Sequence, residues 1–149
     1  MTEKRRETTR LRKSRRFEDL VKIMGLLLGR DGCPWDRRQT HRTLLKYLKE
    51  EAGEVALAVK KNDWENLKEE LGDVLLQVVF HSALARKAGR FSIADVIKNI
   101  NAKLVRRHPH VFGGQKLATP AQVLIEWNKI KKLEKSGKTV KHHRKQNSV

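Results

Sequence analysis

Cysteine, long apolar runs and strand-like alternation are all scarce in this sequence. Its one cysteine, Cys33, cannot form a disulfide within the chain, which agrees with a reducing cytosol. The longest plain apolar run, Met24 to Leu28, is far shorter than the roughly 20 residues that a membrane-spanning helix needs. Almost no segment alternates apolar and polar residues as a half-buried strand does. We therefore expect a cytoplasmic protein without a membrane span and with little or no β-sheet.

Acidic residues are also scarce at the two ends of the chain. Residues 1–16 contain eight Lys or Arg against two Glu, and residues 128–149 contain eight against one, whereas the formal charge of the whole chain is +17. Few apolar residues accompany this charge, so neither end can bury much surface. We predict disordered basic tails at residues 1–16 and 136–149, around one domain at residues 17–135. Such tails suit nonspecific contact with nucleic acid.

Between the tails, apolar residues recur at helical spacing, and glycine and proline mark the breaks. We expect loops at residues 29–40, which read GRDGCPWDRRQT, and around His108-Pro109. Four or five helices with short connections predict an all-α fold, a helical bundle. The expected helices cover residues 17–28, 43–60, 63–87 and 92–107, and a last one begins at residues 119–120.

Two of these helices carry carboxylates at the edge of their apolar side. At about 100° per residue, Glu51 and Glu54 lie about 60° and 120° from Leu48, and Glu70 and Asp73 lie at the same angles from Leu67. In an antiparallel pair the four carboxylates could share one pocket, where they resist ionisation unless a cation joins them. Oxygen ligands favour Mg²⁺, Mn²⁺ or Ca²⁺. Acidic residues three apart also occur on solvated helix faces, and spacing alone leaves both interpretations open.

Several stretches resemble the MazG nucleoside triphosphate pyrophosphohydrolases. They are GCPWDRRQTHRTLLKYLKEEAGEV, NLKEELGDVLLQVVFHSALARKAGRFSIADV and KLVRRHPHVFG, and the resemblance extends over about residues 17–135. It implies an all-α bundle built by helices of two subunits, hence a homodimer or a higher homo-oligomer. It also implies hydrolysis of a nucleoside triphosphate to the monophosphate and pyrophosphate with Mg²⁺, for which Mn²⁺ is a possible substitute. The implied metal ligands are Glu51, Glu54, Glu70 and Asp73.

The resemblance assigns further roles at matching positions. Lys103 and Arg107 lie four residues apart, on one face of their helix, and suit the phosphate oxygens. Glu50 lies away from the apolar side; by resemblance it orients or deprotonates the attacking water and joins Lys103 and Arg107 in the catalytic set. Trp127 and Trp35 are candidates for stacking on the base, although either indole could instead pack against the protein.

Two other functions remain open, and one departure from the family stands out. A basic-tailed protein could bind nucleic acid on an inactive MazG-like scaffold, and a related all-α pyrophosphatase acts on dUTP alone. The intact carboxylate positions argue against the first, and the GCPWD and RRHPHVFG blocks argue against the second. Many MazG proteins carry two tandem domains, whereas we expect one here. The hypothesis is therefore an enzyme that limits cellular or noncanonical nucleotides.

Overall fold

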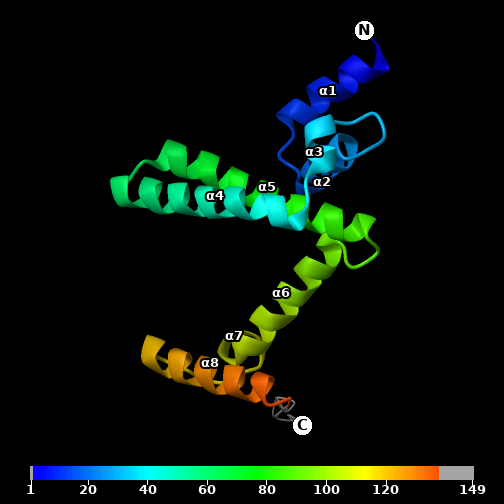
Figure 1. Cartoon of the computed structure of the whole chain (residues 1–149). Coiled ribbons are helices and arrows are strands. Elements are labelled where there is room, and N and C mark those ends of the chain that lie inside the picture. Colours follow the sequence, from blue (N-terminus) through cyan, green and yellow to red (C-terminus); the bar gives the residue numbers. More distant parts are fainter. Residues whose placement is uncertain (1, 138–149) are drawn as a thin grey trace. The chain divides into compact units, whose positions relative to one another are not determined.

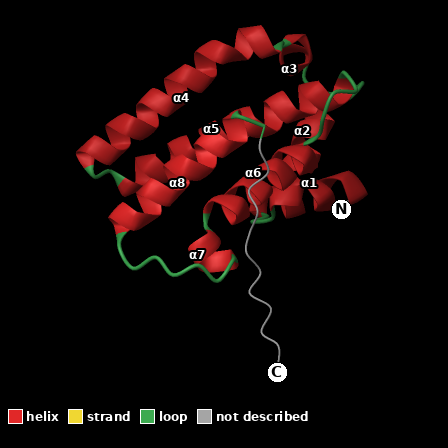
Figure 2. Cartoon of the chain, turned by 90° about the horizontal axis from the view of Figure 1, so that it is seen from below, coloured by secondary structure: helices red, strands yellow, loops and turns green. Residues whose placement is uncertain are grey.

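The computed structural model describes residues 2–137, and these residues form eight helices and no strand (Figures 1 and 2). The predicted all-α fold is confirmed. The helices are α1 (Glu3–Lys13), α2 (Phe17–Leu27), α3 (Pro34–Arg38), α4 (His41–Lys61), α5 (Trp64–Lys87), α6 (Ile93–Arg107), α7 (Pro109–Phe112) and α8 (Pro120–Lys135). Most of the predicted tail at residues 136–149 lies outside the described residues. No helix within residues 2–137 is both long and apolar enough to cross a membrane.

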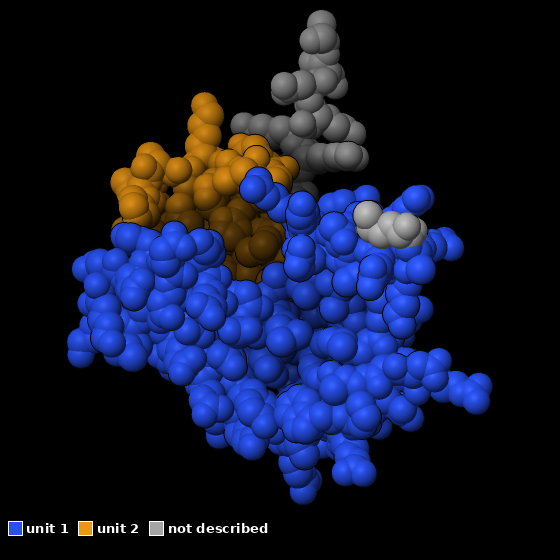
Figure 3. Space-filling model, turned by 90° about the horizontal axis from the view of Figure 1, so that it is seen from above, with its two compact units in different colours: residues 1–93 blue, residues 94–149 orange. Residues whose placement is uncertain are grey.

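The chain divides into two compact units, residues 1–93 and 94–149 (Figure 3). The core of the first unit lies where α2 packs on α5 and α4 runs along α5. Each large apolar side chain that is fully buried there contributes roughly 1.5–3 kcal/mol to folding. The second unit contains most of α6, together with α7 and α8, and Ile130 and Pro109 are buried in it. The buried cluster of the first unit consists of Met24, Leu28, Leu44, Val79 and Phe80.

The pair α4–α5 is the longest regular feature of the first unit, and local signals in the sequence fix both of its ends. Thr40 and Thr43 form a reciprocal capping box at the start of α4, with N···O distances of 3.2 and 2.9 Å. At the other end Asn62 adopts the left-handed conformation, with φ of 54°, and Asp63 caps α5 by accepting a hydrogen bond from the Asn66 amide. The two-residue connection makes α4 and α5 antiparallel neighbours.

Within residues 1–16, where we expected a disordered tail, the structure has helix α1. Charged side chains hold this helix instead of apolar ones. Arg10 reaches from α1 to both oxygens of Asp19 on α2, at 2.9 Å each, and Ser14 donates to the same carboxylate at 2.6 Å. Glu7 pairs with Arg10 and with Lys22 of α2. Asp19 is only 7% exposed, so this ionic contact is shielded from solvent on one side.

Two segments that we expected to be loops also contain short helices. Pro34 opens α3 inside residues 29–40, and Pro109 opens α7 after the break at His108. Proline has no amide hydrogen and a fixed φ near −65°, which suits the first position of a helix. The prediction used Pro120 as the start of a helix but interpreted Pro34 and Pro109 as part of a loop and a break, and therefore missed both turns.

Candidate functional site

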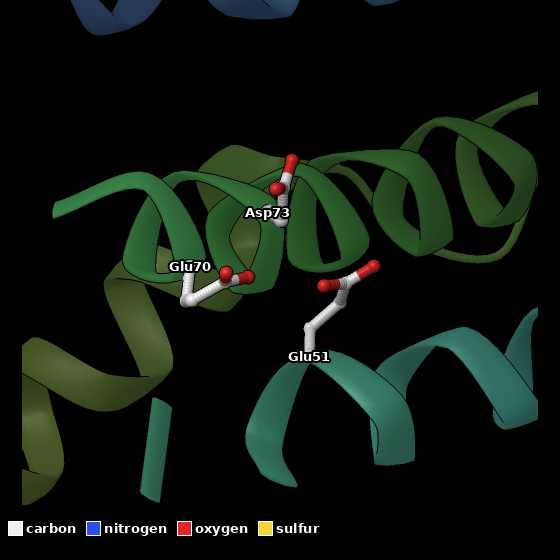
Figure 4. A group of neighbouring side chains, drawn as sticks. All are labelled: Glu51, Glu70 and Asp73. Carbon is white, nitrogen blue, oxygen red and sulfur yellow. The ribbon is translucent and has the colours of Figure 1, made fainter. Parts of the chain in front are cut away.

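Three carboxylates gather in the space between α4 and α5. Glu51 projects from α4, and Glu70 and Asp73 project from α5 (Figure 4). One oxygen of each lies within 4.8 Å of the other two. Glu70 is only 8% exposed, whereas Glu51 and Asp73 are partly exposed. The antiparallel pairing of the two helices thus brings residues about 20 positions apart in the sequence to one point.

This crowding raises the pKa of two of the carboxyl groups. Burial is the largest cause of the raised pKa of Glu70, followed by the charge of Glu54 and a hydrogen bond with its side chain. Burial is likewise the first cause for Glu51, and the charge of Asp73 comes second. Protonation or a cation can relieve such repulsion. Carboxylate oxygens are hard ligands, so the cluster fits a hard divalent cation such as Mg²⁺ or Mn²⁺.

The two remaining acidic candidates lie at the edge of this cluster. Glu54 is exposed and is not one of the three mutually close groups, but its side chain hydrogen-bonds to that of Glu70. Glu50 is exposed on α4, as its angle from the apolar side predicted, and its charge contributes to the raised pKa of Glu51. The structure therefore brings three of the four predicted ligands into one group and puts the fourth in contact with one of them.

The predicted phosphate-binding residues, Lys103 and Arg107, lie on α6 in the second unit. That these two residues act on one substrate together with the carboxylates of the first unit stays a prediction. Arg107 is held by Glu134 of α8, with 2.7 Å between Nη2 and Oε2 and 3.3 Å between Nε and Oε2. Its neighbour Arg106 takes the other oxygen of Glu134, with 2.6 Å between Nε and Oε1.

Sequence reasoning missed Glu134, although it is the one acidic residue of the basic stretch 128–149. Its two guanidinium partners, Arg107 first, hold the pKa of this carboxyl at about 2. A solitary carboxylate among many cations was the available signal, but only the fold shows which cations it contacts. The adjacent Arg106 is one of them.

The two candidate tryptophans have different surroundings. Trp35 lies on α3, is 51% exposed, and meets the ring of Tyr47 edge-on at 5.8 Å between centroids. Trp127 lies on α8 and is 37% exposed. The Cζ atom of Arg107 lies 5.9 Å from the centre of the Trp127 ring, and the Nζ atom of Lys131 lies 5.2 Å from it. Both indoles are thus accessible, and Trp127 is beside the predicted phosphate-binding arginine.

Two more polar side chains follow Asp73 at four-residue intervals on α5. Gln77 is buried, and its Oε1 atom has no hydrogen-bond partner within the described residues. One turn further, His81 lies against His41 of α4, with 2.8 Å between their Nδ1 atoms. Burial, and then the charge of His41, lower the pKa of His81. A row of polar groups therefore continues from the carboxylates toward the start of α4.

Comparison with known proteins gives a consistent result. Residues 39–112, which include all four predicted metal ligands, match the model of the MazG nucleotide pyrophosphohydrolase domain. A crystal structure of a mazG-related protein from Thermotoga maritima superposes with a TM-score of 0.66 at 34% identity, covering 77% of this chain and 98% of that one.

Curated relatives are similar over most of the present chain. The nucleoside triphosphate pyrophosphohydrolase/pyrophosphatase MazG of Thermotoga maritima is 51% identical over 122 residues, which are 82% of this chain and 46% of the relative. The nucleoside triphosphate pyrophosphohydrolase of Escherichia coli K12 is 44% identical over 108 residues, 72% of this chain and 41% of the relative. The chain thus spans less than half the length of these relatives.

The carboxylate cluster generates a prediction about metal binding. Folding raises the pKa of Glu70 above the value that this carboxyl has in the unfolded chain. At pH values above that unfolded-state pKa, ionisation of Glu70 therefore lowers the stability of the metal-free fold. We expect Glu70→Gln to raise the melting temperature of metal-free protein at neutral pH. In the wild type, Mg²⁺ or Mn²⁺ at a concentration of 100 times Kd should raise the melting temperature by about 5–10 °C. Glu70→Gln should lose this increase. Thermal scans with and without metal measure both effects.

The matched control is Glu69→Gln, which removes an exposed carboxylate next to Glu70 in the sequence. It should leave the metal-free melting temperature and the gain from metal close to those of the wild type. A full gain from metal in Glu70→Gln would contradict the assignment of the cluster.

Proposed function

Because this chain belongs to the MazG family, we propose that it hydrolyses nucleoside triphosphates to the monophosphate and pyrophosphate. The observation that carries the proposal is the cluster of Glu51, Glu70 and Asp73 within the segment that matches the family domain. Both curated relatives described above are named for this activity. Its proposed role is to limit cellular or noncanonical nucleotides in the cytoplasm, which agrees with a chain that has a single cysteine.

We propose Mg²⁺ as the cofactor, with Mn²⁺ as a possible substitute. Glu51, Glu54, Glu70 and Asp73 would hold it, which fits the oxygen donors and the mutual repulsion of these groups. When bound, such an ion neutralises charge on phosphate oxygens and makes water easier to deprotonate. The four side chains would also fix its position relative to the substrate.

Other residues of the chain would bind the substrate and move the proton. Lys103 and Arg107 would compensate the charge of the triphosphate, and Trp127 and Trp35 would stack on the base. A water oxygen would attack the α-phosphorus while the bond from that phosphorus to the oxygen that bridges the α- and β-phosphates breaks, and this oxygen would leave with the pyrophosphate. Glu50, exposed on α4 one residue before Glu51, would orient this water and accept its proton. The stabilisation would be mainly positional and electrostatic.

The activity is tested with a panel of canonical and modified nucleoside triphosphates, dUTP included. We expect release of pyrophosphate and monophosphate in the presence of Mg²⁺. Glu54→Gln and Asp73→Asn should each lower kcat/KM by about 10²-fold or more, because they remove charge that holds the cation. Glu69→Gln serves as the control with an unchanged rate.

Several results would decide against this function. Release of orthophosphate and a diphosphate would mean cleavage of the wrong bond. Turnover that is indifferent to both substitutions would mean that another site, or a contaminant, does the chemistry. Turnover of dUTP alone would favour the dUTP-specific alternative.

We also propose that the protein works as a homodimer or a higher oligomer. Apolar side chains on one side of α5 stay exposed in the single chain, among them Trp64, Leu71, Leu75 and Val78. They lie within about 60° of one another around the helix axis. Exposed apolar surface of this kind is typical of an interface.

Light scattering coupled to size exclusion tests the oligomer. We expect a mass at least twice the 17.3 kDa of the chain, and a mass of one chain for Leu75→Lys, because a buried charge without a partner disfavours association. Leu26→Lys replaces an exposed leucine of α2 and should leave the mass of the wild type unchanged. A wild type of 17.3 kDa would contradict the proposal.

The basic ends of the chain support a second candidate function, nonspecific contact with nucleic acid. On α1, Arg5, Arg6 and Arg12 are exposed, and the ion pairs of this helix within the described residues engage Glu7, Arg10, Lys22 and Asp19 instead. Uncompensated cations on one short helix suit the phosphates of a nucleic acid backbone.

Fluorescence anisotropy with a duplex DNA of arbitrary sequence, measured over a range of salt concentrations, tests this contact. We expect log K to fall linearly with log salt, and the triple substitution of Arg5, Arg6 and Arg12 by Gln to reduce the slope by up to about 2.7. Triphosphate hydrolysis should be unaffected. A slope that is the same in both proteins would rule out α1 as the contact.

A further inference from the structure

Two consecutive arginines at the end of α6 share one carboxylate of α8. Oε1 of Glu134 accepts from Arg106, and Oε2 accepts from Nη2 and Nε of Arg107. The side chains of Glu134 and Arg107 are only 19% and 17% exposed, so their contact is better shielded from solvent than most surface ion pairs. Nε of Arg107 also donates to Oε1 at 3.4 Å. Consecutive residues on a helix diverge by about 100°, and the Glu134 carboxylate lies between the two arginines and binds both.

The contact with Glu134 uses one edge of the Arg107 guanidinium. This group has five N–H donors in a rigid plane, of which Glu134 engages those on Nε and Nη2. Within residues 2–137 no hydrogen bond to Nη1 is found, which leaves this end for another anion. Two guanidinium groups against one carboxylate also leave an excess of positive charge, so Glu134 orients the arginine without cancelling the attraction for phosphate.

The same face of α8 carries an aromatic ring beside this arginine. Trp127, Lys131 and Glu134 are spaced by four and three residues, which puts them on one side of the helix. The guanidinium of Arg107 and the ammonium of Lys131 both lie within 6 Å of the centre of the Trp127 ring. The carboxylate therefore holds the arginine close to the indole that we expect to meet the base.

We propose that Glu134 is a positioning residue, which fixes the Arg107 guanidinium beside Trp127 so that triphosphate and base meet prearranged partners. This inference deepens the proposed function and rests on it. An arginine side chain has many rotamers, and holding it in one of them before the substrate arrives removes part of the entropy that binding would otherwise lose. The benefit should therefore appear in substrate binding, through Arg107, more than in the chemical step.

The test is a double-mutant cycle between Glu134→Gln and Arg107→Met on the triphosphate that the wild type hydrolyses fastest. We expect Glu134→Gln to raise KM roughly tenfold with kcat within about twofold. Arg107→Met should raise KM further, and the double variant should be no worse than Arg107→Met alone, because Glu134 acts through that side chain. Glu134→Asp, which keeps the charge, should show a smaller increase in KM than Glu134→Gln.

Arg106→Met is the matched control, since it removes the other partner of the same carboxylate. It should lower thermal stability but keep KM within about twofold of the wild type. Equal increases of KM in Arg106→Met and Glu134→Gln would overturn the proposal, because the contact would then only join the helices. Effects of Glu134→Gln and Arg107→Met that multiply in the double variant would overturn it as well.

Failure of the proposed function can be told apart from failure of this inference. If the wild type hydrolyses no triphosphate of the panel, calorimetric titration with inorganic tripolyphosphate and Mg²⁺ replaces kinetics. Weaker binding by Glu134→Gln, with unchanged binding by Arg106→Met, would support the positioning role without the enzyme assignment. Absence of binding to the wild type, or equal binding by all variants, would overturn it.

Discussion

Repulsion between the carboxylates on α4 and α5 opposes the packing of these two helices against each other. Side chains that lie within 4.8 Å of one another in a partly buried space favour the separation of the two helices when they are ionised. Apolar packing around Leu44, Val79 and Phe80 must therefore hold α4 and α5 together. Protonation or a bound cation relieves this repulsion, and the binding of a cation is the role that we propose for the cluster.

Much of the site was accessible from the sequence because helix geometry is regular. The positions of Glu51, Glu70 and Asp73 relative to the apolar residues, with a short connection that makes an antiparallel pair, indicated one shared pocket as one of two interpretations. The structure brings these three side chains together. The ends of α4 and α5 were predicted to within two residues. In the structure Thr40, Asn62 and Asp63 form the caps at these ends.

What the sequence did not reveal depends on contacts between distant side chains or on competing local effects. Glu134 lies 27 residues from Arg107, and nothing in the spacing of either indicates the other. Helix α1 contradicts its composition, because a charged segment usually stays unfolded unless ions on another element pair with it, as Asp19 does here. The short helices α3 and α7 begin at prolines whose helix-starting role competes with their helix-breaking role.

Acid acts in opposite directions on the two kinds of carboxylate in this molecule. The pKa values of Asp19 and Glu134 are about 2, below the ordinary range of a carboxyl group. Their ion pairs therefore stabilise the fold fully at pH values above that ordinary range, and this stabilisation is lost as the pH falls toward 2. Glu51 and Glu70 have raised pKa values, take up protons earlier, and lose their repulsion when they do. Acidification therefore loosens the attachment of α1 and of α8 while it relaxes the pair α4–α5. Unfolding in acid would begin at α1 and α8 and reach the pair α4–α5 last.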